Sequence, residues 1–155
     1  MEECGLSEII TAPISGRLVQ LESVPDPVFA EKMLGDGIAI LPSEGILVSP
    51  VDGVIAALPR SSHACGIVSS SGLEILIHVG IDTVDMEGRG FEALAVKGES
   101  VSAGQTLIVF DMDEIAKAGK SCVSPVVISG VDVEVLATGE VSRGEPLLSV
   151  TKTDH

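Results

Sequence analysis

Short runs of aliphatic residues, separated by Gly, Pro, Ser and Asp, recur along almost the whole chain. Runs of this kind, rich in Val and Ile and bounded by turn-forming residues, are typical of β-strands. These runs do not alternate with long amphipathic helices, which argues against a doubly wound α/β fold. The pattern predicts strands at residues 9–12, 16–22, 37–41, 46–49, 53–58, 64–69, 73–79, 91–95, 106–110, 125–129 and 147–150.

Two pairs of segments repeat, and the repeats indicate an internal duplication. Residues 13–21 match residues 50–58 at their Pro, Gly, Leu and branched positions, and residues 98–107 share Val-x-x-Gly-x-x-Leu with residues 139–147. Glycines at fixed offsets before apolar strands indicate tight turns that need a positive φ. Short strands in two copies predict an all-β fold, namely an antiparallel β-sandwich or barrel with internal duplication.

One or two short helices interrupt this pattern. Asp111 is a capping residue with Glu three positions on, and Gly119 can end the helix that it begins. Residues 28–34 can form a helical turn after Pro-Asp-Pro. Residues 1–8 are weakly patterned, and we expect this terminus to fray. The length suits a single domain that covers residues 1–155.

The segment 61–80 reads as two strands joined by a Ser-Ser-Gly turn. If the turn is centred between Ser70 and Ser71, His63 lies directly opposite His78, and both imidazoles emerge on one face with Cβ atoms roughly 5 Å apart. Cys65, Ile67, Glu74 and Leu76 share that face, whereas the opposite face, made of Ala64, Val68, Leu73, Ile75, Ile77 and Val79, is almost wholly apolar. We therefore expect the histidine pair on the outer face, in a register that a one-residue slip would invert.

The charge balance narrows the function classes. Nine Lys and Arg against 23 Asp and Glu give a net charge of −14, which argues against nucleic-acid binding and favours fast encounter with a basic protein partner.

Three cysteines without Cys-x-x-Cys spacing argue against a disulfide framework and a structural zinc site. The sequence has no signal-peptide pattern and no apolar run of transmembrane length, so we expect a cytoplasmic protein without direct membrane insertion.

A series of motifs carries a family resemblance over nearly the whole chain. The motifs are Ala12–Gly16, Val24–Lys32, Gly35–Ile40, Pro50–Gly53, His63–Ala64, Ile77–Val84, Gly88–Phe91 and Ser124–Ser129. In this order they closely resemble the glucose-type enzyme IIA domain (EIIA-Glc) of the bacterial phosphoenolpyruvate-dependent sugar phosphotransferase system, most specifically from His78 to Val84. The resemblance implies a compact antiparallel β-sandwich of the duplicated-hybrid-motif type.

The resemblance also implies a phosphotransferase component that works through a phosphohistidine. It would accept a phosphoryl group from the histidine-containing phosphocarrier protein, HPr, and pass it to the IIB domain of a sugar permease of glucose, N-acetylglucosamine or β-glucoside type. His78 matches the histidine modified on Nε2, and His63 matches the supporting histidine. Ser61 matches a position that can donate a hydrogen bond, and its alternative role is that of a turn residue. A neutral imidazole is available as a nucleophile, and an N–H beside it can stabilise the transferred group. No cofactor is required.

A docking surface around the two histidines follows from the same resemblance. Asp26 and Asp82 would meet basic side chains of the partners, or alternatively cap turns. The apolar members, whose alternative role is core packing, are Phe29, Leu34, Ile38, Leu76 and Val84. Many relatives place phenylalanines around the pair where this chain has Pro59, Gly66 and Leu76, so we expect a shallower or softer surface.

The histidine pair and the fold also allow other functions to be considered, namely zinc binding, two other protein classes and a regulatory role. His63 and His78 could bind Zn²⁺ incidentally, with Cys65 and Glu74 nearby, but a dedicated site is not expected. Zinc peptidases of the lysostaphin type need a His-x-His segment, and biotinyl or lipoyl carriers need a Met-Lys-Met-like turn; the chain lacks both. A regulatory role, in which the unphosphorylated domain binds transporters or kinases, is an alternative that the sequence does not weigh.

Overall fold

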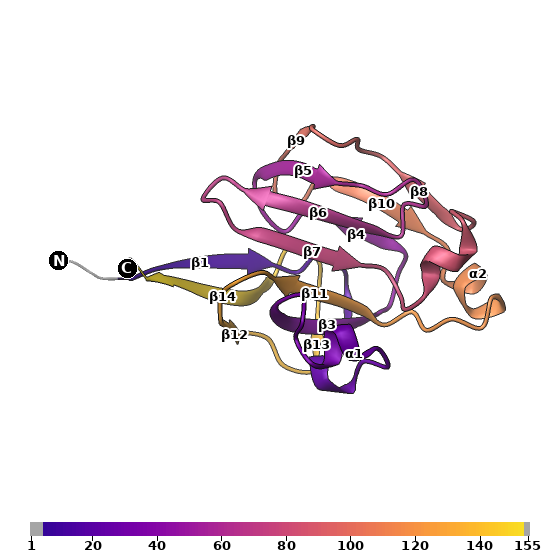
Figure 1. The fold of residues 1–155 in the computed structure, drawn as a ribbon, viewed down its shortest axis with the longest axis horizontal. Coiled ribbons are helices and arrows are strands. Elements are labelled where there is room, and N and C mark those ends of the chain that lie inside the picture. Colours follow the sequence, from indigo (N-terminus) through magenta and orange to yellow (C-terminus); the bar gives the residue numbers. More distant parts are fainter. Residues whose placement is uncertain (1–4, 154–155) are drawn as a thin grey trace.

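The computed structural model describes residues 5–153, which fold into short strands with two short helices (Figure 1). The strands are β1 (Gly5–Thr11), β2 (Gly16–Val19), β3 (Asp36–Pro42), β4 (Ile46–Val48), β5 (Gly53–Ala57), β6 (Ala64–Ser69), β7 (Glu74–His78), β8 (Phe91–Ala93), β9 (Ser100–Val101), β10 (Thr106–Phe110), β11 (Ser124–Ile128), β12 (Val133–Val135), β13 (Glu140–Val141) and β14 (Pro146–Thr153). The helices are α1 (Pro27–Ala30) and α2 (Met112–Lys117), with 3₁₀ turns η1 (Leu21–Ser23) and η2 (Thr83–Met86).

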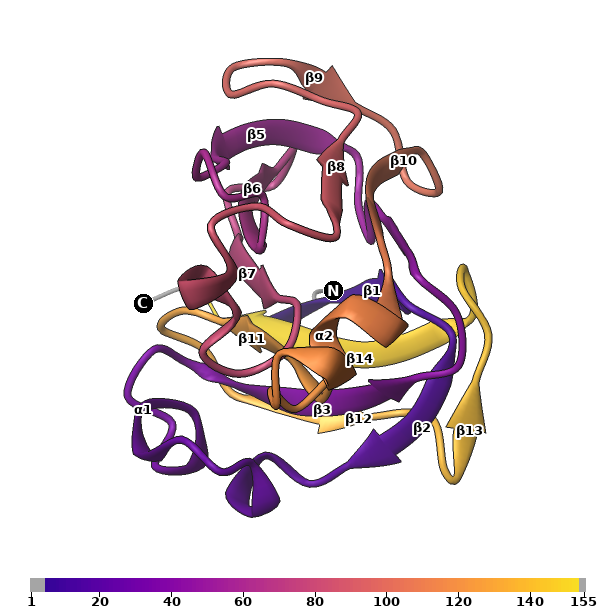
Figure 2. The ribbon, with the colours of Figure 1, turned by 90° about the vertical axis from the view of Figure 1, so that its right-hand side faces the viewer.

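The strands form one large and two small sheets, and every pairing within them is antiparallel. The large sheet has the order β13-β2-β3-β11-β7-β6-β5-β9, and the small sheets are β1-β14-β12 and β4-β10-β8. Figure 1 shows β5, β6, β7 and β11 following one another across one side of the molecule, and Figure 2 shows β8 and β10 of a small sheet to the right of β6 and β7. This arrangement confirms the antiparallel all-β fold.

The internal duplication is visible in the hydrogen bonds of the repeated segments. β2 pairs with β13 at one end of the large sheet, and β5 pairs with β9 at the other. The turn after β9 is closed by the Ser102 N–H, which donates to Gln105 Oε1 at 3.1 Å, and the turn after β13 is closed in the same way by Ser142 and Glu145 Oε1 at 2.7 Å. The two repeats seen in the sequence therefore build equivalent halves of one sheet.

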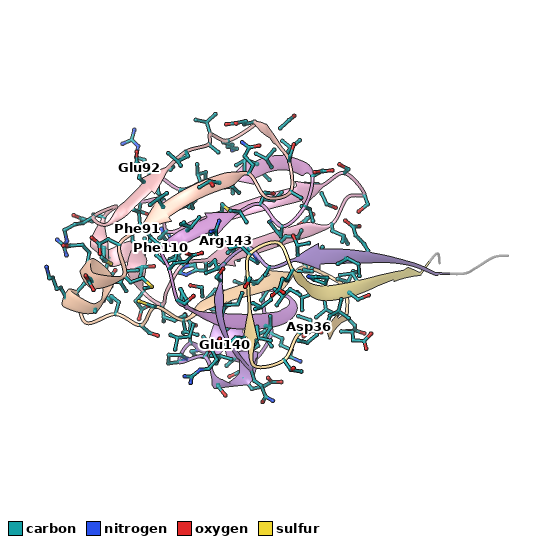
Figure 3. The ribbon with its side chains drawn as sticks, turned by 180° about the vertical axis from the view of Figure 1, so that it is seen from behind. Asp36, Phe91, Glu92, Phe110, Glu140 and Arg143 are labelled. Atoms are coloured by element: carbon teal, nitrogen blue, oxygen red, sulfur yellow. The ribbon has the colours of Figure 1, made fainter. Side chains whose placement is uncertain are left out.

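The core is almost entirely aliphatic, as the scarcity of aromatic residues requires. A main cluster fills the space between the sheets, with Ile10, Ile40 and Leu107 fully buried. The aromatic pair Phe91 and Phe110, seen from behind in Figure 3, lies stacked with ring centroids 6.4 Å apart. A second, smaller cluster lies on the other face of β3 and β11, under α1. It is this second cluster that brings α1 against the large sheet.

The secondary-structure predictions hold in most places and fail at the shortest elements. The Asp111 carboxylate accepts hydrogen bonds from the N–H groups of the next turn, as expected of a cap, and begins α2. Residues 5–8, which were expected to fray, instead belong to β1 and pair with β14; residues 1–4 lie outside the described residues. The strands β9, β12 and β13 were not predicted, because two or three residues carry too little pattern to be recognised.

Candidate functional site

His78 ends strand β7, and its ring is oriented by the loop that follows. Its Nδ1 lies 2.6 Å from the carbonyl oxygen of Gly80. A carbonyl oxygen can only accept a hydrogen bond, so Nδ1 carries the proton and Nε2 keeps a free lone pair in the neutral ring. The side chain is half-buried, with the ring of Phe29 tilted against it at a centroid distance of 5.4 Å. The ring nitrogen of His78 with a free lone pair is therefore Nε2.

The loop that carries the Gly80 carbonyl is held in place by hydrogen bonds of Gly80 and its neighbours. Gly80 adopts a φ of 75°, and its N–H donates to Ser124 Oγ at 3.3 Å. On either side, the buried Thr83 hydroxyl donates to the Val79 carbonyl at 2.5 Å, and the Ile81 N–H donates to the Ser121 carbonyl at 3.0 Å. Sequence reasoning placed Asp82 and Val84 of this loop in the site but gave no role to Gly80, although a glycine directly after a strand was a signal for a left-handed turn.

His63 approaches His78 from the chain just before β6. Ser62 has a left-handed φ of 57°, and the His63 carbonyl accepts a hydrogen bond from the Val79 N–H at 2.7 Å. The two imidazole rings meet edge to face, with centroids 4.9 Å apart and an interplanar angle of 71°. His63 Nδ1 is hydrogen-bonded to the hydroxyl of Ser61. A hydroxyl that donates to Nδ1 leaves the His63 proton on Nε2, where it can serve as a donor.

The predicted convergence of the histidines is confirmed, but the predicted register is wrong by one residue. His78 pairs with Ala64 rather than with His63, and Cys65 pairs with Ile77 in the buried core. The face assignment of β7 is correct, whereas that of β6 is inverted, so that Cys65 and Ile67 face inward. His63 still lies beside His78, because it precedes β6 and follows Ser62, whose φ is left-handed. The alternation of side chains along the strand therefore does not determine where His63 points.

Burial controls the protonation of both rings. Burial lowers the pKa of His63 below the usual 6.5, and the neighbouring His78 lowers it further. Burial also lowers the pKa of His78, opposed by the hydrogen bond to Gly80 and by the carboxylates of Asp26 and Asp82. Both imidazoles are therefore mainly neutral at pH 7, which is the state that a nitrogen nucleophile needs.

Two of the predicted surface residues, Phe29 and Ile38, are buried, although the Phe29 ring contacts that of His78. Asp26 lies near His78 and caps α1, accepting from the Val28 N–H at 3.0 Å, which confirms its predicted capping role. Asp82 and Val84 are exposed at η2. Ile38, in contrast, is buried in the main core cluster and is not a surface residue.

Leu34 and Leu76 contribute to an open hollow of about 470 Å³ on the outer face of the large sheet. Gly66 also lines it, so the surface is concave at this point, and the prediction of a shallower surface is wrong here.

Among the described residues, the histidine pair by itself supplies two possible metal ligands. Zn²⁺ in proteins is held by three or four N, S or O ligands. Within residues 5–153, no group of three or more His, Cys, Asp or Glu side chains could hold a metal ion. Cys65, expected near the pair, lies on the inner face instead, and burial raises its pKa to about 12, which disfavours the thiolate that binds metals.

Comparison with known proteins agrees with this geometry. The family model of the phosphoenolpyruvate-dependent sugar phosphotransferase system, EIIA 1, matches residues 8–134. The chain belongs to this enzyme IIA family. A glucose-specific EIIA component from Bacillus cereus is 53% identical over 125 residues, which cover 81% of this chain and 76% of the relative. The glucose-specific EIIA component of Halalkalibacterium halodurans is 43% identical over 94% of this chain and 86% of its own length.

Two further comparisons show how the enzyme IIA domain occurs elsewhere. The structure of glucose permease IIA from Mycoplasma capricolum superimposes with a TM-score of 0.89 at 36% identity and covers 96% of this chain and 99% of that chain. In Staphylococcus carnosus, the glucose-specific EIICBA component is 41% identical over 92% of this chain, which corresponds to 22% of that longer protein. In the present chain, no helix within residues 5–153 is long and apolar enough to cross a membrane.

Proposed function

We propose that this enzyme IIA domain carries a phosphoryl group on Nε2 of His78, between the phosphocarrier HPr and the IIB domain of a sugar permease. The observation that supports this most directly is the hydrogen bond from His78 Nδ1 to the Gly80 carbonyl at 2.6 Å. It fixes the tautomer, orients the ring, and leaves Nε2 as the free nucleophile.

The transfer step exchanges one nitrogen–phosphorus bond for another. Nε2 of neutral His78 attacks the phosphorus of the phosphohistidine on the donor, and the donor's N–P bond breaks as the new one forms. The His78 ring gains positive charge during this step, because its Nδ1 proton is retained. The Gly80 carbonyl oxygen stabilises that charge through the hydrogen bond.

His63 is the residue that stabilises the phosphoryl oxygens. Its ring lies edge to face with that of His78 at 4.9 Å, and the Ser61 hydroxyl at Nδ1 favours a proton on Nε2. An N–H directed at the phosphoryl oxygens lowers the energy of the transition state as charge spreads over them. Ser61 acts as a positioning residue, because it touches His63 and not the transferred group.

Glucose is the sugar that the comparisons favour for the permease. The relatives from Bacillus cereus and Halalkalibacterium halodurans are named as glucose-specific components. The fused Staphylococcus carnosus relative, an EIICBA component, supports a IIB domain as the acceptor. The sugar itself binds to the permease and not to the enzyme IIA domain, so the assay of specificity is transfer to IIB domains of glucose, N-acetylglucosamine and β-glucoside type.

Phosphorylation with phosphoenolpyruvate, enzyme I and HPr tests this function. The protein should gain one acid-labile phosphoryl group, and His78→Ala should abolish it. His63→Ala keeps the nucleophile and should accept phosphate, but it should pass phosphate on to IIB slowly because the stabilising N–H is lost. His155→Ala, which removes the third histidine of the chain, serves as the control and should behave as the wild type. Labelling that survives in His78→Ala would contradict the proposal.

A further inference from the structure

Two buried hydroxyl groups bind the same peptide unit, the one between Val79 and Gly80, directly after His78. The Thr83 hydroxyl donates to the Val79 carbonyl oxygen at 2.5 Å, and the Gly80 N–H donates to Ser124 Oγ at 3.3 Å. Both hydroxyl side chains are fully buried. The peptide unit is therefore held at its carbonyl end and at its N–H end by two side chains to which the transfer step gives no role.

Ser124 reaches this peptide unit from a neighbouring strand. It begins β11, which pairs with β7 (Figure 1), and it lies 44 residues from Gly80 along the chain. Its own hydroxyl proton is engaged, because Ser124 Oγ donates to the Cys122 carbonyl at 2.8 Å. A hydroxyl oxygen whose proton is used in this way presents a lone pair to other donors. The side chain of Ser124 is therefore oriented as an acceptor for the Gly80 N–H.

The orientation of this peptide unit determines where the Gly80 carbonyl oxygen lies. With the unit held at both ends and a φ of 75° at Gly80, the carbonyl oxygen lies 2.6 Å from His78 Nδ1. The Ile81 N–H, which donates to the Ser121 carbonyl at 3.0 Å, restrains the same carbonyl group from its other side. Glycine has more backbone freedom than any other residue, so its conformation here depends on contacts from outside. The two hydroxyls supply part of that restraint.

We propose that Thr83 and Ser124 are positioning residues for phosphoryl transfer, because they fix the carbonyl that keeps the His78 proton on Nδ1. The inference rests on the proposed function of His78, and it adds two residues that act through the Gly80 carbonyl. A neutral imidazole carries its proton on either ring nitrogen, and only the form with the proton on Nδ1 can attack through Nε2. The rate of transfer is therefore reduced by the fraction of molecules in the other form.

Separate removal of each hydroxyl tests the proposal. Thr83→Val removes the first hydroxyl and keeps a branched side chain, Thr83→Ser keeps that hydroxyl, and Ser124→Ala removes the second. Nitrogen-15 NMR should show a single His78 tautomer, with the proton on Nδ1, in the wild type and in Thr83→Ser. It should show a mixture of tautomers in Thr83→Val and in Ser124→Ala, and phosphorylation by phospho-HPr should slow about three- to tenfold in both. If Thr83→Val fails to fold, Ser124→Ala provides the same test.

Thr11→Val and Ser49→Ala are the matched controls. The Thr11 hydroxyl donates to the Pro50 carbonyl at 3.0 Å, and the buried Ser49 hydroxyl donates to the Val51 carbonyl at 2.6 Å. Each control therefore removes a hydroxyl that donates to a backbone carbonyl, and each should lose stability. The His78 tautomer and the phosphorylation rate of both controls should remain those of the wild type.

The tautomer is measured on the unphosphorylated protein alone, which separates this proposal from the function on which it rests. If phospho-HPr does not label His78 in the wild type, it is the proposed function that fails. If the wild type is labelled, but the folded hydroxyl-deficient variants keep either the single tautomer or the wild-type rate, the positioning role is overturned. Loss of stability without these two effects, as in the controls, would leave Thr83 and Ser124 a purely structural role.

Discussion

The loop after β7 offers the sharpest test of how the fold orients His78. In Gly80→Ala, the added Cβ would lie 2.6 Å from Thr83 Cγ2 and 2.7 Å from the Ser121 carbonyl oxygen, and the residue would keep a φ of 75°. A non-glycine residue in the left-handed region costs about 1–2 kcal/mol, and overpacking costs about 1–3 kcal/mol more. We therefore expect Gly80→Ala to lower the free energy of unfolding by about 2–5 kcal/mol.

Gly130 provides the matched control, because it has a φ of 73° and nothing within 4 Å of its would-be Cβ. Gly130→Ala should therefore lose only the conformational part, about 1–2 kcal/mol, in urea denaturation. In Gly80→Ala the loop must also shift, so the Gly80 carbonyl should release His78 Nδ1. Nitrogen-15 NMR should then show a mixture of His78 tautomers, and phosphorylation should slow about tenfold, which corresponds to about 1.4 kcal/mol. Equal stability loss in both variants, with an unchanged tautomer, would refute the anchoring role.

The remaining predictions concern protonation and charge. Burial lowers the pKa of His63 and His78 below 6.5, so below that pH the unfolded chain binds more protons than the folded chain. The stability that depends on these rings being neutral is therefore fully present above pH 6.5, and it is lost as the pH falls toward their pKa values in the folded protein. In urea denaturation between about pH 7 and 5.5, the free energy of unfolding of His63→Gln should therefore fall less steeply with decreasing pH than that of the wild type. With a net charge of −14, phosphorylation by a basic donor should slow with rising salt, and Asp82→Asn should flatten that dependence. A rate that is independent of salt would exclude electrostatic steering.

Local patterns in the sequence were sufficient for the strands, the duplication and the two histidines. Strands longer than about four residues carry enough aliphatic periodicity to be recognised, and the repeated Pro and Gly positions identify the equivalent halves. The capping residue of α2 was also evident, because Asp111 bonds to N–H groups only two and three residues away. Each of these features depends on residues that are close together in the chain, so it can be recognised from the sequence alone.

The tertiary structure decided the register of the hairpin and the surroundings of His78. An outer face that included Cys65 looked acceptable from the sequence, yet packing between the sheets buries Cys65 and shifts the pairing of His78 to Ala64. The bond from His78 Nδ1 to the Gly80 carbonyl spans only two residues, but the loop that carries Gly80 is held by Ser124 and Ser121, which are distant in sequence. The hollow at Gly66 likewise combines segments that are distant in sequence. A pattern with a period of two records which residues alternate, but only contact between sheets determines which set faces inward.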